Sequence, residues 1–280
     1  MLSNASPDSS FANACVLVTG AANGIGAALA QALLAQGARV IAVDQDAAGL
    51  QALRAGVGAR AFASEGASEG ASEGTAQLFT AEVDISDAAA VNAAVAQGES
   101  ALGPIDKLAC VAGILQMGKI ADLTDDQWAR TFAVNVNGTF NVCRAVAQGM
   151  IARKRGAIVN VSSNAATTPR ASMGAYAASK AAVTQMTRCL GLELAEHGIR
   201  CNIVSPGSTD TEMQRAMWRT GSSAEMVIEG SLAGYRLGIP LRKIARADEI
   251  VDSILFLLSD RASHVTLHDL RVDGGATLDQ

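Results

Sequence analysis

The stretch T-G-A-A-N-G-I-G, residues 19–26, follows the apolar run Cys15–Thr19 and precedes an Ala-rich helical pattern. Three glycines at this spacing serve separate purposes where a strand turns into a helix. Gly20 permits the tight turn, Gly24 lets the backbone approach a pyrophosphate, and Gly26 allows close helix–sheet packing. The helix N-terminus then offers backbone N–H groups to phosphates. The stretch predicts a dinucleotide site, with an ordinary glycine-rich turn as the alternative.

Short β-branched runs alternate with longer helical patterns along the chain. Several of these runs are apolar on both faces, as expected for strands covered by helices on both sides. The alternation predicts a single α/β domain, a doubly wound parallel sheet of the Rossmann type. We expect strands at 15–19, 39–43, 79–83, 107–111, 157–161, 200–204 and 269–272, and helices near 25–37, 87–101, 125–153, 175–196 and 247–259.

Three segments fall outside this alternation. Residues 1–13 are polar and predict a flexible tail before a domain over 14–280. The repeat S-E-G-A-S-E-G-A-S-E-G predicts a flexible solvated loop at 63–75, with a functional acidic patch as the alternative. The mixed polar segment 212–235 predicts a mobile lid.

The composition argues against several classes of protein. The net charge is −5 and the basic residues are scattered, so no basic stripe favours nucleic acid. Apolar runs are too short to cross a bilayer, and no secretory signal is visible, which favours a cytoplasmic protein. The five cysteines form no C-x-x-C pair and only three histidines occur. We expect reduced thiols packed in the core, without a disulfide framework or a metal site.

Acidic residues end the second and third predicted strands. Asp44 lies 18 residues beyond Gly26, where a carboxylate can accept both ribose hydroxyls of NAD and repel the 2′-phosphate of NADP. Asp44 therefore predicts NAD, although Asp44 or Asp46 could instead cap the next helix. Asp84 could contact the adenine edge or cap the helix near Ser86.

A candidate catalytic set follows the fifth predicted strand. Tyr176 and Lys180, in Y-A-A-S-K, are one helical turn apart and share a face. Ser163 lies at the carboxyl end of a strand, where α/β sheets place their sites. An ammonium about 4.5 Å from the tyrosine oxygen supplies about 3.7 kcal/mol at an effective dielectric of about 20. That is enough to bring the pKa of a tyrosine close to neutrality.

Together these motifs resemble the short-chain dehydrogenase/reductase family, from about residue 14 to the C-terminus. The resemblance implies that Tyr176 is the base, that Lys180 lowers its pKa and holds the nicotinamide ribose, and that Ser163 orients the substrate oxygen. Asn135, in N-V-N-G, would hold a proton-relay water. From the residues alone, Asn135 is a helix-interior amide that bonds the backbone.

The same resemblance assigns the cofactor site and marks one departure. The family usually has N-N-A-G after the fourth strand, whereas residues 110–113 are C-V-A-G. This departure predicts weaker cofactor binding or lower stability, and Cys110 is expected to be a packing residue. The expected NAD-binding residues are Gly20, Asn23, Gly24, Ile25, Gly26, Asp44, Asp84, Ile85, Ala112, Gly113, Tyr176, Lys180, Pro206, Gly207, Thr209 and Thr211.

Several segments are similar to one group within the family, whose members oxidise a carboxylated cyclohexadiene diol to a catechol acid for siderophore biosynthesis. These segments are 112–118, 132–136, 168–170, 205–215, 237–246 and 263–278. The substrate carboxylate calls for a cation, with Arg170 as the first candidate and Arg215 as the second. The expected substrate residues are Leu115, Met117, Arg170, Met173, Met213, Gln214 and Arg215.

The resemblance also implies a homotetramer packed through long Ala-rich helices. Two other functions remain open from the sequence. One is a short-chain alcohol dehydrogenase of the sugar-alcohol, steroid or acyl-carrier reductase type. The other is a non-catalytic NAD-binding regulator on the same fold.

Overall fold

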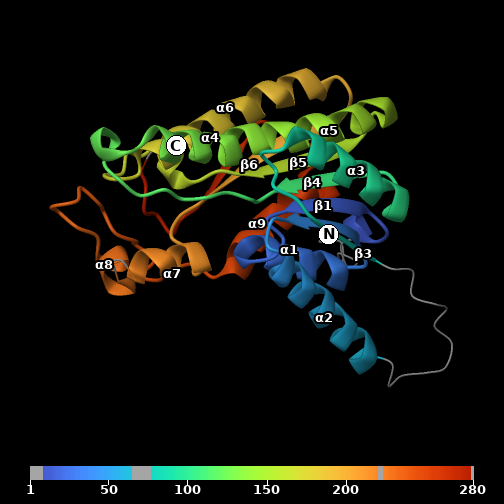
Figure 1. Ribbon diagram of the computed structural model, residues 1–280, viewed down its shortest axis with the longest axis horizontal. Helices are drawn as coiled ribbons and strands as arrows, with labels where there is room; N and C mark the ends of the chain where they lie inside the picture. The colour runs from blue at the N-terminus through green and yellow to red at the C-terminus, as the bar shows by residue number, and fades with distance from the viewer. Residues whose placement is uncertain (1–8, 65–76, 220–222, 279–280) are drawn as a thin grey trace, which may run out of the picture.

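Seven parallel strands form one sheet in the computed structural model, which describes residues 9–64, 77–219 and 223–278 (Figure 1). The strand order is β3-β2-β1-β4-β5-β6-β7. The order reverses between β1 and β4, which is where doubly wound sheets bind ligands. The strands are β1 (Cys15–Thr19), β2 (Arg39–Asp44), β3 (Leu78–Glu82), β4 (Lys107–Cys110), β5 (Gly156–Val161), β6 (Ile199–Pro206) and β7 (Asp269–Val272).

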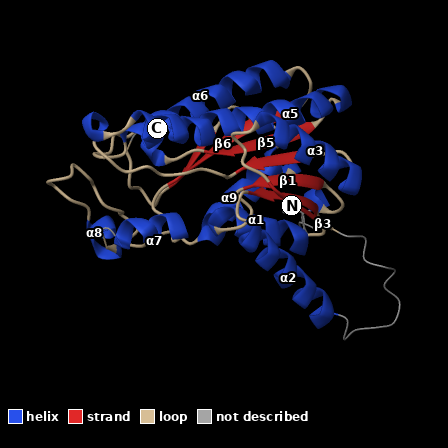
Figure 2. Ribbon diagram, viewed as in Figure 1, coloured by secondary structure: helices blue, strands red, loops and turns tan. Residues whose placement is uncertain are grey.

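Helices cover both faces of this sheet (Figure 2). One layer contains α3 (Ala88–Leu102), α4 (Asp125–Phe132), α5 (Thr139–Arg153) and α6 (Gly174–Ala195). The opposite layer contains α1 (Gly24–Ala35), α2 (Ala47–Ser64) and α9 (Ala247–Leu258). Two further helices, α7 (Glu212–Arg219) and α8 (Ala224–Glu229), lie beside the sheet, and together with the segment 230–242 that follows they are called the α7–α8 arm. The α/β class and the doubly wound parallel sheet are confirmed.

The two layers create two hydrophobic cores, one on each side of the sheet. Alternate residues of β1 divide between them because successive side chains of a strand point to opposite faces. Val16 and Val18 pack with α1 and α9, whereas Leu17 packs with α3 and α5. Cys15, Cys110, Cys143 and Cys201 are buried as predicted, but Cys189 is exposed on α6, so the expectation of core packing is wrong for that thiol.

Residues 9–13, the last part of the predicted N-terminal tail, are described by the structure. Residues 9–11 form a 3-10 turn, and the Phe11 ring is 1% exposed beneath the Lys107 ammonium. The apolar ring anchors this part of the segment to the first core. Residues 1–8 lie outside the described residues. So does the repeat beyond Ser64, where α2 ends, and the predicted loop at 63–75 therefore stays a prediction.

The predicted helix at 125–153 is interrupted. A π-helical turn, η3 (Ala133–Gly138), separates α4 from α5. Asn135 lies in this turn, and its side chain bonds the backbone of Ile114 in the segment after β4. π-turns inside α-helices often mark functional sites. No helix among the described residues is both long and apolar enough to cross a membrane.

Candidate active site

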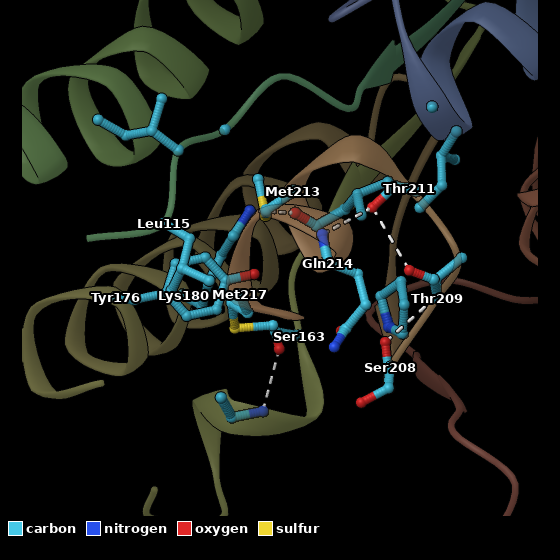
Figure 3. A pocket seen from close by; sticks show the side chains of 18 of the residues that line it. Leu115, Ser163, Tyr176, Lys180, Ser208, Thr209, Thr211, Met213, Gln214 and Met217 are labelled. Carbon is cyan, nitrogen blue, oxygen red and sulfur yellow. Dashed lines mark hydrogen bonds between the residues drawn. The ribbon is translucent and has the colours of Figure 1, made fainter. Parts of the chain in front are cut away.

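One large cavity lies at the carboxyl ends of the strands, with a volume of about 680 Å³. This volume is within the range of small-molecule and cofactor sites. Figure 3 shows Tyr176 and Lys180 of α6 and Ser163, after β5, around the same space as Met213 and Gln214 of α7. All of the sequence-predicted NAD-binding residues line this cavity. The loop–helix turn, the end of β5 and the α7–α8 arm therefore meet at one site.

The glycine turn is shaped for close approach. Gly20 has φ +69°, and a Cβ there would lie 2.8 Å from the Ala112 nitrogen. A Cβ on Gly26 would lie 2.0 Å from the Gly20 carbonyl oxygen. Asn23 begins α1 but its side chain makes no capping bond, so the first-turn N–H groups have no side-chain cap. The turn fits a bound dinucleotide phosphate.

The second strand ends with two carboxylates that have different partners. Asp44 Oδ2 accepts from the Ala22 N–H at 3.0 Å, and Asp44 Oδ1 accepts from the Asp46 N–H at 3.0 Å. A carboxylate has about four acceptor positions, so these bonds leave room for ribose hydroxyls. Asp46 accepts from the Gly49 N–H and from the Asn23 amide. Asp46 is therefore the carboxylate that caps the start of α2.

Asp84 follows β3 and lines the cavity, but it also organises the chain around it. The Ser86 N–H and hydroxyl both donate to Asp84 Oδ1, and Arg130 pairs with Oδ2 at 3.0 Å. Burial favours a higher pKa for Asp84, but these bonds outweigh burial and lower the pKa. Asp84 therefore stabilises the turn at Ser86, one of the two predicted roles. Its contact with the adenine edge stays a prediction.

The C-V-A-G segment at residues 110–113 is held to β1, and the predicted effect of its departure from the family pattern on cofactor binding or stability stays a prediction. Thr19 Oγ1 accepts from the N–H groups of Val111 and Ala112 at 3.1 and 3.2 Å, which ties the end of β1 to the end of β4. Cys110 is buried in the second core beside Cys143, and a hydrogen bond with that thiol, together with burial, raises the pKa of Cys110 well above its usual value. The prediction that Cys110 is a packing residue agrees with this environment.

Ser163, Tyr176 and Lys180 come together at the cavity as the sequence predicts. Ser163 begins a short 3-10 turn after β5, and its Oγ accepts from the Ala165 N–H. The Ser163 hydroxyl acts on Tyr176 by lowering the pKa of its phenol. The Lys180 Nζ lies 5.8 Å from the centroid of the Tyr176 ring.

The electrostatics of this trio differ from the sequence argument. Burial raises the pKa of Tyr176, and the hydrogen bond with Ser163, rather than the Lys180 charge, lowers it in part. Lys180 instead donates to the Val161 carbonyl at 2.9 Å. Burial also lowers the pKa of Lys180 to about 8. The Coulomb argument omitted this desolvation, which acts against the charged form of both groups.

Asn135 is fully buried and does not line the cavity. Its Oδ1 accepts from the Ile114 N–H at 2.8 Å, and its Nδ2 donates to the Ile114 carbonyl and to Ser179. The Thr139 hydroxyl donates to the Asn135 carbonyl at 2.7 Å. The geometry therefore matches the helix-interior amide that the residues alone favoured. A relay water at Asn135 stays a prediction.

The predicted substrate residues line the cavity with one exception. Arg215 does not line it, because its guanidinium makes a two-point ion pair with Asp210 at 2.8 and 3.0 Å. This pairing does not favour Arg215, and its role as the second candidate for the substrate carboxylate stays a prediction. The residues that do line the cavity are Leu115, Met117, Arg170, Met173, Met213 and Gln214.

The α7–α8 arm supplies residues that sequence reasoning missed. Met217, Met226, Val227 and Arg236 line the cavity, although they lie within or just beyond the predicted lid, where no motif marks them. Their proximity comes from tertiary structure: Val227 packs with Ile239 and with Ala276 near the C-terminus. Movement of this arm as a lid stays a prediction.

Comparison with known proteins agrees with this geometry. The family model described as "short chain dehydrogenase" matches residues 14–221. The chain is 49% identical to a 2,3-dihydro-2,3-dihydroxybenzoate dehydrogenase of Bacillus subtilis, over 93% of this chain and 95% of that protein. It is 43% identical to a vibriobactin-specific 2,3-dihydro-2,3-dihydroxybenzoate dehydrogenase of Vibrio cholerae, over 97% and 99%. A solved levodione reductase superposes with a TM-score of 0.84 at 29% identity, covering 95% of this chain and 98% of that one.

Proposed function

The chain belongs to the short-chain dehydrogenase family, and we propose that it oxidises 2,3-dihydro-2,3-dihydroxybenzoate to 2,3-dihydroxybenzoate with NAD. The observation that carries this proposal is the cavity, which joins a dinucleotide turn to a serine–tyrosine pair and an apolar wall. The two relatives that bear this activity in their names support it over nearly their whole length. The presence of Ser163, Tyr176 and Lys180 together at the cavity argues against a non-catalytic regulator.

The choice of NAD over NADP rests on Asp44. Its carboxylate lines the cavity next to the glycine turn and keeps acceptor positions beyond its two backbone bonds. A fixed negative charge there favours ribose hydroxyls and repels a 2′-phosphate. A nicotinamide held in this cavity would supply the hydride acceptor for the ring carbon.

The proton chemistry belongs to the chain itself. Tyr176 Oη accepts the proton of the ring hydroxyl, and Ser163 Oγ holds the same oxygen by hydrogen bonding. Both side chains line the same cavity. Loss of a hydride from carbon and of a proton from oxygen gives a ring ketone. The ketone tautomerises to an aromatic catechol, which favours the forward direction.

The apolar part of the cavity suits a ring with one charged substituent. Leu115, Met117 and Met173 offer adaptable contacts to the ring. The cavity lining also includes arginine side chains, which suits a carboxylate on the ring. We further propose a role in catechol siderophore biosynthesis, a cytoplasmic location and a homotetramer packed through the Ala-rich helices. Light scattering on the purified protein tests the assembly.

A turnover assay tests the proposed activity directly. The protein is mixed with NAD and either the carboxylated dihydrodiol, a cyclohexanol or an acyclic sugar alcohol, and NADH is followed by absorbance. We expect the carboxylated dihydrodiol to give the highest kcat/KM by at least about tenfold. A higher kcat/KM for the sugar alcohol would contradict the proposed substrate and favour a sugar-alcohol dehydrogenase.

A further inference from the structure

Arg236 is a half-buried cation at the cavity, and the residues that the structure describes hold no carboxylate partner for it. It lines the same cavity as Ser163 and Tyr176. Burial alone lowers the pKa of its guanidinium, with no carboxylate acting in the opposite direction. Other arginines of the arm are paired, Arg215 with Asp210 and Arg242 with Glu229. A desolvated and unpaired guanidinium is unfavourable unless an anion comes to it.

The backbone around Arg236 fixes its position. Its N–H and carbonyl both bond to Ser231 at 2.9 Å, which forms a short antiparallel bridge. Ser231 Oγ accepts from the Gly234 N–H inside the turn. Gly230, with φ +83°, begins the turn where a Cβ would lie 2.5 Å from the Arg236 carbonyl oxygen. The guanidinium is therefore carried by a constrained turn.

A second polar group of the arm also lacks a partner. Gln214 is 6% exposed, and its Nε2 has no hydrogen-bond partner. Figure 3 shows the Gln214 side chain extending from α7 into the cavity. An amide N–H buried without an acceptor is rare, because the lost hydration is not replaced. Gln214 and Arg236 thus present hydrogen-bond donors to the same cavity.

The acidic residues of the cavity lie elsewhere or are neutralised. Asp44 and Asp84 belong to the nucleotide side, after β2 and β3. Glu212, on the arm, pairs with Arg219. The arm therefore faces the cavity with an unpaired positive charge, an amide donor and the methionines 213, 217 and 226. This combination matches an apolar ring that carries a carboxylate.

We propose that Arg236 binds the carboxylate of the ring substrate and that Gln214 Nε2 donates a hydrogen bond to the same group. The proposal rests on the proposed function and assigns its anion specificity to the arm. Arg170, the candidate from the sequence, already interacts with another group in the protein. Arg170 is therefore the comparison that the experiment must include.

Measuring the affinity for the product tests carboxylate binding by Arg236 and Gln214 independently of catalysis. Titration calorimetry measures the Kd of 2,3-dihydroxybenzoate and of catechol, which lacks the carboxylate, for the enzyme with NADH bound. Arg236→Met should raise the Kd of 2,3-dihydroxybenzoate about 10- to 150-fold and change the Kd of catechol less than about twofold. Gln214→Leu should raise the first Kd about tenfold. Arg236→Lys should retain part of the selectivity because it keeps the charge.

Three controls identify the cause of any change. Arg242→Met removes a neighbouring arginine that does not line the cavity, and both Kd values should stay within about twofold of wild type. The Kd of NADH should be unchanged by Arg236→Met. Near-ultraviolet circular dichroism checks that the arm keeps its packing, and Arg236→Lys serves as the folded substitute if the methionine variant does not fold.

The outcomes distinguish this proposal from the proposed function. If Arg236→Met leaves the preference for 2,3-dihydroxybenzoate unchanged while Arg170→Met removes it, the assignment to Arg236 is wrong and the function stands. Equal weakening of both ligands, or of NADH, also overturns the assignment. If the wild type binds catechol as tightly as 2,3-dihydroxybenzoate and does not oxidise the dihydrodiol, the proposed function itself fails.

Discussion

Burial shifts the pKa values of Tyr176 and Lys180, the proton-transfer pair, in opposite directions. Burial raises the pKa of Tyr176 and lowers that of Lys180 to about 8, so both neutral forms are favoured. The bond from Ser163 is the contact that favours the tyrosinate. Lys180, held by the Val161 carbonyl, is fixed near the ring. Catalysis at neutral pH therefore requires the tyrosinate form of Tyr176 to gain stabilisation within the reacting complex, whereas Lys180, with a pKa of about 8, is mostly charged at that pH.

Tyr176→Phe removes the oxygen that accepts the proton and leaves the ring in place. We expect kcat to fall by at least about 10²-fold, the lower range for general acid–base catalysis, with unchanged affinity for NADH. Stopped-flow turnover and NADH fluorescence measure the two quantities. Tyr235→Phe is the matched control, because Tyr235 is 94% exposed and does not line the cavity. Near-normal turnover in Tyr176→Phe would remove this residue from the mechanism.

Lys180 makes stability depend on pH in a defined direction. Its pKa is about 8 in the folded protein and 10.5 in an unfolded chain. Between these values the unfolded state binds about one more proton, so the stability contributed by this group rises with pH and is lost as pH falls to about 8. Relative to Lys180→Met, the wild type should gain about 3 kcal/mol of unfolding free energy from pH 8 to pH 10.5. Urea unfolding at several pH values measures this difference, and a flat difference would contradict it.

Asp44→Ala tests the choice of cofactor. Removing the carboxylate should lower kcat/KM with NAD about 10- to 100-fold, because charge-assisted bonds to the ribose are lost. The preference for NAD over NADP should narrow at the same time. Steady-state kinetics with both cofactors gives the ratio. Equal efficiency with NAD and NADP in the wild type would be incompatible with this role.

At the scale of elements, helix α1 and the turn before it are a single close-packed unit. Gly26→Ala would place a Cβ 2.0 Å from the Gly20 carbonyl oxygen, so the helix must move away from the strand. We expect a loss of at least about 1–3 kcal/mol of stability, as for other overpacked sites, together with loss of NADH binding. Gly56→Ala in α2 is the matched control, because no atom lies within 4 Å of its Cβ position.

The control substitution should change the free energy of unfolding in the opposite direction. Alanine is favoured over glycine inside a helix, so Gly56→Ala should raise the unfolding free energy by about 0.5–1 kcal/mol and leave NADH binding unchanged. Thermal and urea unfolding compare the two variants with wild type. A Gly26→Ala protein with wild-type stability and affinity would contradict the close packing of this turn.

The sequence predicted most elements because their patterns are local. All seven strands, the glycine turn and the Ser163–Tyr176–Lys180 set follow from residues close together in the chain. The π-turn at Asn135 was missed because it depends on Ile114, a residue 21 positions away. The pairing of Arg215 with Asp210 was not weighed in the sequence argument, and it does not favour a role for Arg215 in binding the substrate carboxylate. Arg236 carries no motif, and only the fold brings it to the cavity.

At the scale of the whole molecule, the two halves of the sheet contribute different parts of the cavity. On one side of the switch point, β1, β2 and β3 lead to the glycine turn, Asp44 and Asp84. On the other side, the β5–β7 strands lead to Tyr176 and Lys180 and into the α7–α8 arm. The switch point between β1 and β4 lets both halves reach one cavity. Cofactor choice and substrate choice are therefore properties of separate segments.

The central claim is that one oxidation by this chain converts the carboxylated dihydrodiol into an aromatic catechol acid. The most direct measurement follows NADH by absorbance and 2,3-dihydroxybenzoate by chromatography in the same reaction. The account predicts one 2,3-dihydroxybenzoate for each NADH, and loss of both products in Tyr176→Phe. NADH formed without the catechol acid, or no NADH from this substrate at all, would contradict the account.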